Sequence, residues 1–250
     1  MSSSKSIRAE HLQIQQQIND LKILYTNATS LENKIDEFKV TLEYFRPSIV
    51  GITETWFKSS SIANINGYSL YRKDRSDGRR GGGVALYVEN KIASYEFEDA
   101  YFNISKIEQV WCVLVFGKSK YLIGCIYRPD DMKDLIDLRR TFEVARQYVD
   151  DGYFKDVLIM GDFNFPNIKW SNGCIDNIVT GENSIEYHFQ DIVYDAFLFQ
   201  HVNIPTFQLD DNVSDNILDL VFTSQQNNVY ELKTSSMMMF SVKSIIHRLN

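Results

Sequence analysis

An acid and an amide two residues apart, Asp162 and Asn164, follow a short apolar run, Val157–Met160. Such a continuous run is typical of a strand that is covered on both faces. Because alternate residues of an extended chain point the same way, we expect Asp162 and Asn164 on one side and Phe163 and Phe165 on the other. A carboxylate beside an amide suits a hard cation with a phosphate, or the aiming of an attacking water. An Asp after a strand also starts ordinary turns, so this pair alone indicates either a site or a turn.

Other polar residues stand at or near the ends of strand-like runs elsewhere in the chain. They are Asn27 after Lys22–Thr26, Glu54 after Ser48–Thr53, Tyr127 at the end of Tyr121–Tyr127, and Asp219 within Ile217–Phe222. Singly, each has a structural explanation, such as a turn former, a cap or an interfacial aromatic. Collected on one rim, three acids, two amides and a phenol would form a site for a cation and a phosphate.

Strands and helices must position these residues, and the hydrophobic pattern predicts both. Helical stripes recur at Leu31, Ile35, Phe38, Leu42 and Phe45, at Leu135, Leu138, Phe142, Ala145 and Val149, and over roughly Ile185–Phe199. Further strand-like runs are Tyr68–Tyr71, Val84–Val88 and Val110–Phe116. Several neighbouring strands have short connections, which favour antiparallel pairing. We therefore expect an α/β sandwich of two sheets rather than a doubly wound parallel sheet.

Size and composition limit the class of protein. The chain has 250 residues, of which 44% are hydrophobic, enough for one domain with a full core. A net charge of -7 argues against wholesale coating of nucleic acid but allows a local basic rim. Cys112, Cys125 and Cys174 form no C-x-x-C pair and indicate reduced thiols of an intracellular protein. Apolar runs far shorter than the ~20 residues that cross a bilayer predict a soluble chain, and residues 1–20 predict a loose or helical extension.

Six segments in order resemble the endonuclease/exonuclease/phosphatase superfamily, and within it the endonuclease domain of LINE-type non-LTR retrotransposons. They are Ile23-Leu-Tyr-Thr-Asn-Ala28, Ile49-Val-Gly-Ile-Thr-Glu-Thr-Trp56, Tyr71-Arg-Lys-Asp-Arg75 with Gly81-Gly-Gly-Val-Ala-Leu-Tyr87, Ile126-Tyr-Arg-Pro129, Ile159-Met-Gly-Asp-Phe-Asn164 and Ile217-Leu-Asp-Leu-Val-Phe-Thr223. The resemblance extends from about residue 21 to residue 223, most of the chain.

This resemblance implies a four-layer, deoxyribonuclease-like α/β sandwich that hydrolyses a phosphodiester with Mg²⁺ or Mn²⁺. It implies DNA as the partner, nicked on one strand and held by its phosphate backbone. It also implies a reverse transcriptase domain in the full-length element and access to the nucleus, although no clear targeting signal is present. The roles it implies are Glu54 as main metal ligand with Asn27, Asp162 for the attacking water, Asn164 for the scissile phosphate, Tyr127 as donor to a phosphate oxygen, and Asp219 to orient a catalytic histidine.

A basic stretch precedes the glycine run 81–83 and contains Arg72, Lys73, Arg75, Arg79 and Arg80. Such a loop could contact the DNA backbone, which positions a duplex without reading its sequence. It would supply the local positive potential that the net charge lacks. The alternative is an ordinary solvated hairpin with exposed arginines.

The end of the chain departs from the family, which has a Ser-Asp-His segment followed by a closing strand. Within the domain expected at 21–250 we recognise neither, and His247, the histidine of this tail, follows Ser244-Ile-Ile. We therefore expect an uncovered sheet edge and nicking that is weak or lost, because loss of a group acting in the transition state costs orders of magnitude. A non-catalytic nucleic-acid or protein interaction domain on the same fold, and an enzyme acting on RNA or a small phosphoester, are the alternatives.

Overall fold

The computed structural model describes residues 20–131, 135–171, 173–178, 181, 183–206, 216–237 and 240–248. Residues 1–19, which make up almost all of the expected N-terminal extension, lie outside these ranges. Each of the strand-like runs named above forms a strand in the structure, with ends that differ by a few residues.

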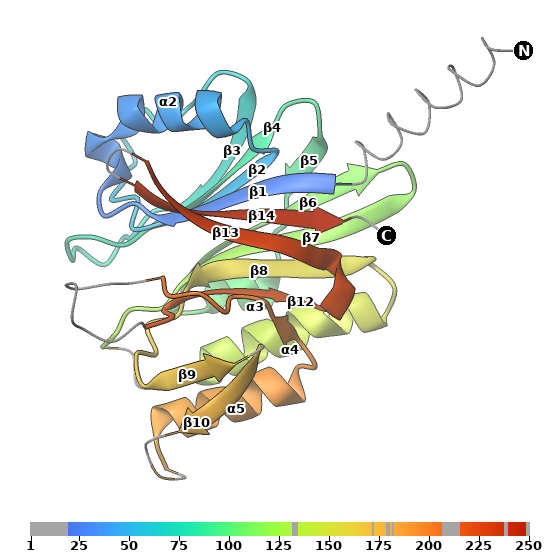
Figure 1. Cartoon of the computed structure of the whole chain (residues 1–250). Helices are drawn as coiled ribbons and strands as arrows, with labels where there is room; N and C mark the ends of the chain where they lie inside the picture. The colour runs from blue at the N-terminus through green and yellow to red at the C-terminus, as the bar shows by residue number, and fades with distance from the viewer. Residues whose placement is uncertain are drawn as a thin grey trace, which may run out of the picture.

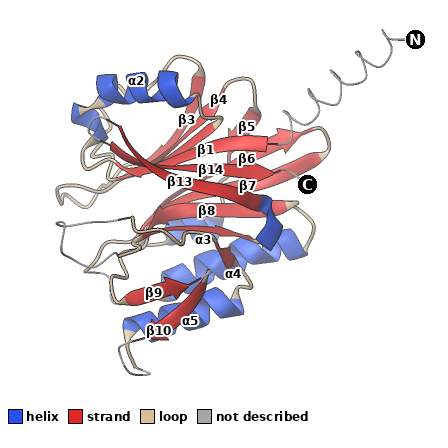
Figure 2. Ribbon diagram, viewed as in Figure 1, coloured by secondary structure: helices blue, strands red, loops and turns tan. Residues whose placement is uncertain are grey.

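Two six-stranded sheets form the centre of the molecule (Figures 1 and 2). The first sheet has the order β13 (Val229–Met237), β14 (Phe240–Arg248), β1 (Asp20–Asn27), β2 (Ile49–Thr53), β4 (Val84–Glu89) and β3 (Tyr68–Lys73). The second has the order β11 (Phe199–Gln200), β12 (Asp219–Thr223), β8 (Asp156–Asp162), β7 (Ser119–Tyr127), β6 (Glu108–Phe116) and β5 (Ala93–Glu96). A separate hairpin pairs β9 (Ile168–Ser171) with β10 (Cys174–Ile178). Neighbours pair antiparallel except β1 with β2 and β7 with β8, which confirms the expected sandwich of mostly antiparallel sheets.

Helices cover the outer faces of this sandwich, as Figure 1 shows. Helix α2 (Ile35–Phe45), which follows the short 3-10 helix η1 (Leu31–Asn33), lies over the first sheet, whereas α4 (Ile136–Asp150) and α5 (Ile185–Asp195) lie beneath the second. The described residues also form α3 (Ala100–Ile104) and the 3-10 helix η2 (Gln226–Asn228). In the described ranges no helix combines the length and the apolar character needed to cross a membrane.

Helix α5 ends at Asp195, four residues before the end expected from the sequence. Phe197 has a φ of 49°, in the left-handed region that terminates helices. Phe199 then begins β11, which pairs with the end of β12. The apolar character of this segment was therefore correct, but its helical extent was wrong.

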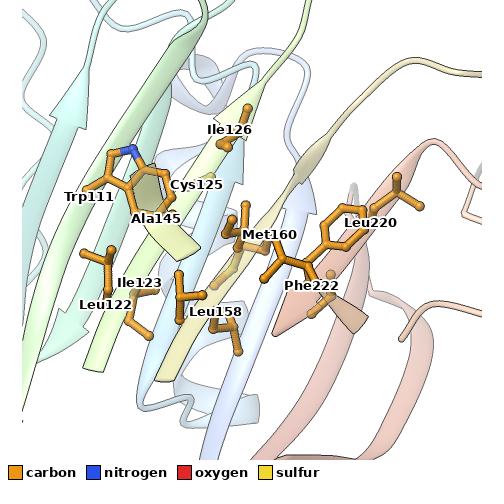
Figure 3. Packing of buried hydrophobic residues seen from close by; sticks show 14 of the residues in the cluster. Trp111, Leu122, Ile123, Cys125, Ile126, Ala145, Leu158, Met160, Leu220 and Phe222 are labelled. Carbon is orange, nitrogen blue, oxygen red and sulfur yellow. The ribbon is translucent and has the colours of Figure 1, made fainter. Parts of the chain in front are cut away.

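Alternate residues of β1 enter two different hydrophobic layers. Ile23 and Tyr25 belong to the core between the sheets, and Leu24 packs in the layer that contains Phe38 of α2. The sheets approach closely where Met160 faces Gly51, because a Cβ on Gly51 would lie 2.3 Å from the Met160 sulfur. Figure 3 shows Met160 within this core.

Two of the three cysteines belong to that core. Cys112 and Cys125 are fully buried, as expected, and burial raises the pKa of both thiols. Cys174 is exposed.

A strand closes the sheet edge that we expected to be open. β1 pairs with β2 on one side and with β14 on the other, and Tyr25 is opposite Lys243. The expectation of a missing closing strand, and of an uncovered edge beside β1, is therefore wrong. The hydrophobic signal of β14 is weak because one face alone is packed: Ile245 and His247 are buried, whereas Ser244 and Ile246 are partly exposed.

Candidate active site

Polar residues at the strand ends meet at one edge of the sandwich. In the first sheet Asn27 is in register with Thr53, the residue before Glu54. In the second sheet Tyr127 and Asp219 flank Asp162 on its two sides. The Asn27 amide Nδ2 donates to Oδ2 of Asp162 across 2.9 Å, and this bond joins the two sheets at the rim.

Asp162 and Asn164 form a turn, and this turn lies at the rim of the sandwich. Strand β8 ends at Asp162, and Asn164 has a φ of 52°, so the extended alternation expected from Asp162 to Phe165 is interrupted at Asn164. The backbone N–H of Asn164 donates to Oδ1 of Asp162 at 3.2 Å, and its amide Nδ2 donates to the carbonyl of Arg128 at 2.7 Å. An amide nitrogen carries two protons, so the Asn164 side chain retains a second donor proton.

Two neighbours hold this turn in place, and the sequence predicted a role for neither. The buried Arg128 guanidinium donates to the carbonyls of Phe163 and Asn164 at 3.2 and 3.1 Å. Burial lowers the pKa of Arg128 from its usual value. Phe163 is fully buried and packs edge-on against Phe222 of β12. Arg128 lies in Ile126-Tyr-Arg-Pro129, one of the six segments that carry the family resemblance, and that membership was the signal in the sequence that pointed to it.

The Glu54 carboxylate is held from several sides. Its Oε2 accepts from the backbone N–H of Gly82 at 3.0 Å and from the indole Nε1 of Trp56. The hydroxyl of Tyr127 also bonds to Glu54. Burial first, and then the neighbouring carboxylates, raise the pKa of Tyr127 well above its usual value. This phenol is therefore a neutral donor whose proton is directed to Glu54.

Asp219 bonds to a phenol. The Tyr25 hydroxyl donates to Oδ1 of Asp219 at 3.0 Å and lies 2.9 Å from the Thr53 hydroxyl. Burial, followed by Asp219 and Asp162, raises the pKa of Tyr25 well above its usual value. Tyr25 thus occupies the near side of Asp219 as a protonated donor.

The histidines of the described ranges lie elsewhere. His188 is exposed on α5, His201 bonds to Thr223 at 2.7 Å, and His247 bonds to Asp156 at 3.1 Å. Asp156 begins β8 and Asp162 ends it, a separation of about 20 Å at the ~3.3 Å rise of a strand. His247 therefore does not substitute for a catalytic histidine at the rim, and His11 lies outside the described residues.

The charge at the rim suits a divalent cation. Glu54, Asp162 and Asp219 bring three carboxylates to one edge, and the part of the chain that the structure describes contains no cluster of three His, Cys, Asp or Glu side chains poised as metal ligands. Mg²⁺ does not need such a cluster, because it keeps several waters and binds through one or two carboxylates and substrate phosphates. Glu54 could supply that carboxylate. Asn27 is the weaker candidate, because its Oδ1 already accepts from Thr29 N at 3.1 Å.

The five cations of the basic loop have different surroundings. Arg72 pairs with Asp74 at 3.4 Å, Arg75 with Glu108 at 2.5 Å, and Arg79 with Asp77 at 2.7 Å and Asp131 at 3.0 Å. Arg80 is exposed, lies 4.9 Å over the ring of Trp56, and has no carboxylate partner among the described residues. Lys73 is likewise exposed and outside the ion pairs of the described ranges. Lys73 and Arg80 therefore have the cationic charge that is most available to a ligand.

Comparisons with known proteins agree with this geometry. Residues 121–241 match a family model described as endonuclease-reverse transcriptase. The endonuclease domain of TRAS1, a telomere-specific non-LTR retrotransposon, superposes with a TM-score of 0.67 at 10% identity, covering 92% of this chain and 99% of that one. The AP endonuclease LMAP from Leishmania major has a TM-score of 0.69 at 11% identity, covering 94% and 89%. The 3'-5' exonuclease NExo from Neisseria meningitidis has a TM-score of 0.62 at 12% identity, covering 92% and 100%.

At these identities the solved structures establish the fold. No curated protein sequence matches the chain. The family resemblance drawn from the six sequence segments is confirmed by the family model together with the fold.

Proposed function

We propose that this chain, a member of the endonuclease/exonuclease/phosphatase superfamily, is a divalent-metal-dependent phosphodiesterase that nicks DNA slowly. One observation carries the proposal: the Asn27 amide bonds to Asp162 across the two sheets, beside Glu54 and Tyr127. An acid for the water, amide donors for a phosphate and a carboxylate for a cation thus share one rim. The linked reverse transcriptase domain remains part of the proposal, suggested by the description of the family model.

Each side chain has a defined task in this proposal. Asp162, fixed by donors on both carboxylate oxygens, accepts a proton from the attacking water. The second amide proton of Asn164 binds a phosphate oxygen, where negative charge grows in the transition state. Mg²⁺ or Mn²⁺ held by Glu54 would supply further stabilisation of that charge.

Tyr127 acts through Glu54 in this arrangement. Its hydroxyl proton is directed to the Glu54 carboxylate, so the structure favours a role in orienting that ligand over direct donation to a phosphate. Its raised pKa keeps the phenol protonated through the physiological range. This assignment differs from the one that the family resemblance implied.

Hydrolysis is expected to be slow because Asp219 bonds to Tyr25 and the described histidines lie elsewhere. The closing strand begins after Ser236-Met-Met-Met239 rather than after a Ser-Asp-His segment. A general acid commonly contributes 10²–10⁴-fold to a rate, and the site would lack that contribution.

The exposed cations Arg80 and Lys73, with the described histidines away from the rim, favour a second candidate, a non-catalytic domain that binds nucleic acid through these cations and the rim. Binding of this kind persists when EDTA removes divalent cations, whereas hydrolysis stops. Fluorescence anisotropy of a labelled duplex with and without EDTA therefore separates binding from cleavage.

Nicking of supercoiled plasmid by the purified chain tests the primary proposal. We expect slow conversion to the open circle in Mg²⁺ or Mn²⁺ and none above background in EDTA or with Asp162→Ala. The matched control is Asp150→Ala, which removes an exposed carboxylate from the end of α4. Equal nicking by the wild type and Asp162→Ala would refute the proposal.

A further inference from the structure

Arg75 stands apart from the other cations of its loop because its side chain is largely covered in its pair with Glu108. The two side chains are 10% and 12% exposed, and Arg75 Nε lies 2.5 Å from Glu108 Oε1. Arg79, four residues later, is half exposed in its pair with Asp77. A DNA-binding role suits an exposed arginine, so Arg75 requires a different explanation.

The Arg75 and Glu108 pair holds both ends of the glycine turn. Arg75 Nη1 donates to the carbonyl of Arg80 at 3.1 Å, at the start of the turn. Glu108 Oε2 accepts from the backbone N–H of Gly83, at its end. A Cβ on Gly82 would lie 2.4 Å from the Arg75 guanidinium carbon, so this turn has formed directly on Arg75.

The glycine turn also holds the Glu54 carboxylate. The N–H of Gly82, between the two clamped residues, donates to Oε2 of Glu54 at 3.0 Å. Backbone bonds from Trp56 N to Gly82 O at 2.9 Å and from Thr55 N to Gly83 O at 3.2 Å fix the two segments together. Glu54 itself has a φ of 56°, so its backbone lies in a region that an isolated glutamate rarely adopts.

We propose that Arg75 and Glu108 are positioning residues that set the orientation of the Glu54 carboxylate through the Arg80–Gly83 turn. This inference rests on the proposed role of Glu54 as the metal ligand. Partners that orient a metal ligand typically change metal affinity 10- to 100-fold when they are lost. Arg75 thus serves the metal site, and Arg80 is left to face the DNA.

Luminescence of Tb³⁺ measures this effect without any turnover. Trp56 and Tyr127 both bond to Glu54, so each can sensitise an ion bound there. We expect the wild type to bind Tb³⁺ with luminescence that Mg²⁺ competes away and that Glu54→Gln abolishes. Arg75→Gln and Glu108→Gln are expected to weaken Tb³⁺ binding by about 10- to 100-fold.

The variants separate positioning from general stability. Arg75→Lys keeps the charge but not the fork of donors, so it should also bind Tb³⁺ more weakly. The double variant Arg75→Gln/Glu108→Gln should bind no more weakly than the worse single variant, since both act through one turn. Arg139→Gln removes an arginine pair with Asp195 away from the rim and should retain wild-type affinity. Each variant is compared well below its unfolding temperature, and Glu108→Gln and Arg75→Lys provide gentler changes if Arg75→Gln is poorly folded.

Two results overturn this inference in distinguishable ways. If Glu54→Gln abolishes Tb³⁺ binding but folded Arg75 and Glu108 variants bind as the wild type does, the positioning role is wrong and the metal site stands. If the wild type has no Tb³⁺ site that depends on Glu54, the proposed metal site and the positioning role fail together.

Discussion

His247 Nε2 lies 3.1 Å from Oδ2 of Asp156, at the opposite end of β8 from Asp162. Asp156 is a buried carboxylate that also accepts from Ser224 N at 3.1 Å and from Asn228 Nδ2 at 2.5 Å. Since His247 belongs to β14, the contact fastens the closing strand of the first sheet to the second sheet.

His247→Ala is expected to lower the free energy of unfolding by about 1–3 kcal/mol, because a buried carboxylate loses a donor. DNA affinity and nicking by the folded fraction should not change. Urea unfolding followed by fluorescence measures the first effect, and His188→Ala, on the exposed face of α5, is the control expected within about 0.5 kcal/mol of wild type. Loss of nicking without loss of stability would instead place His247 in the chemistry.

Stability should fall between pH 6.5 and pH 4 because of His201. Burial, and then the neighbouring His247, lower the pKa of His201 to about 4, while Asp156 opposes this shift. An unfolded histidine titrates near ~6.5, so between these values the unfolded chain binds more protons and stability decreases as pH falls. The loss approaches about 3 kcal/mol at the lower limit, at ~1.4 kcal/mol per pKa unit.

His201→Gln checks this pH dependence. The Thr223 hydroxyl donates to the carbonyl of Gln225, so it accepts from His201, and a glutamine amide can replace that donor. Urea unfolding at pH 7.0, 5.5 and 4.5 should give a flatter profile for the variant. Identical profiles for both proteins would remove His201 as the cause.

Gly161→Ala should be among the most damaging single substitutions in β8. Its Cβ would lie 1.9 Å from the carbonyl oxygen of Ile126, which is backbone of the neighbouring strand and cannot move aside cheaply. We expect a loss of about 1–3 kcal/mol or more, measured as a shift of the urea midpoint. Gly181→Ala, where a Cβ meets open space, is the control. Equal urea midpoints for the two variants would contradict the close approach of β8 to the backbone of β7.

Local hydrophobic patterns predicted most of the elements and, with them, the rim. Asn27, Glu54, Tyr127 and Asp162 each follow or end a strand with a strong apolar pattern, so their common edge could be inferred before the fold was known. β14 was missed because Ser241, Lys243 and Ser244 interrupt the apolar pattern of its sequence. The pattern of a single strand reports burial and does not report which neighbour supplies the pairing.

Long-range polar contacts and unusual backbone angles could not be predicted from the sequence. Arg75 and Glu108 are 33 residues apart, and nothing in either segment indicates that they pair. The positive φ of Glu54 and of Asn164 is imposed by their partners, since non-glycine residues rarely adopt it alone. The basic loop illustrates the consequence: its sequence suggests five equivalent cations, whereas the structure pairs three of them with acids.

Arg80→Ala is expected to weaken DNA binding and to reduce the slope of log affinity against log salt by about 1, because one phosphate contact is lost. Arg79→Ala should leave the slope nearly unchanged, since Asp77 and Asp131 already pair with Arg79. Fluorescence anisotropy titrations of a labelled duplex at salt concentrations from about 50 to about 200 mM measure the slope for each variant. Equal salt slopes for the two variants would indicate that the loop is an ordinary solvated hairpin that does not contact DNA.

The two rim aspartates should differ in their effect on nicking. Asp162→Asn removes the proton acceptor and is expected to slow nicking by about 10²–10⁴-fold. Where an aspartate orients a catalytic histidine, its change to asparagine costs on the order of 10⁴. Asp219 bonds to Tyr25 instead, and an asparagine can still accept from that hydroxyl, so Asp219→Asn should cost less than about tenfold.

Plasmid nicking in Mn²⁺, with Glu54→Gln as the background and circular dichroism as the check of folding, measures both aspartate variants. An Asp219→Asn loss as large as that of Asp162→Asn would mean that Asp219 acts in the reaction and does more than accept from Tyr25. Wild-type nicking no faster than that of Glu54→Gln would favour the second candidate, the non-catalytic domain that binds nucleic acid. The rim would then have three carboxylates but no working general acid, so it would not cleave the bound DNA.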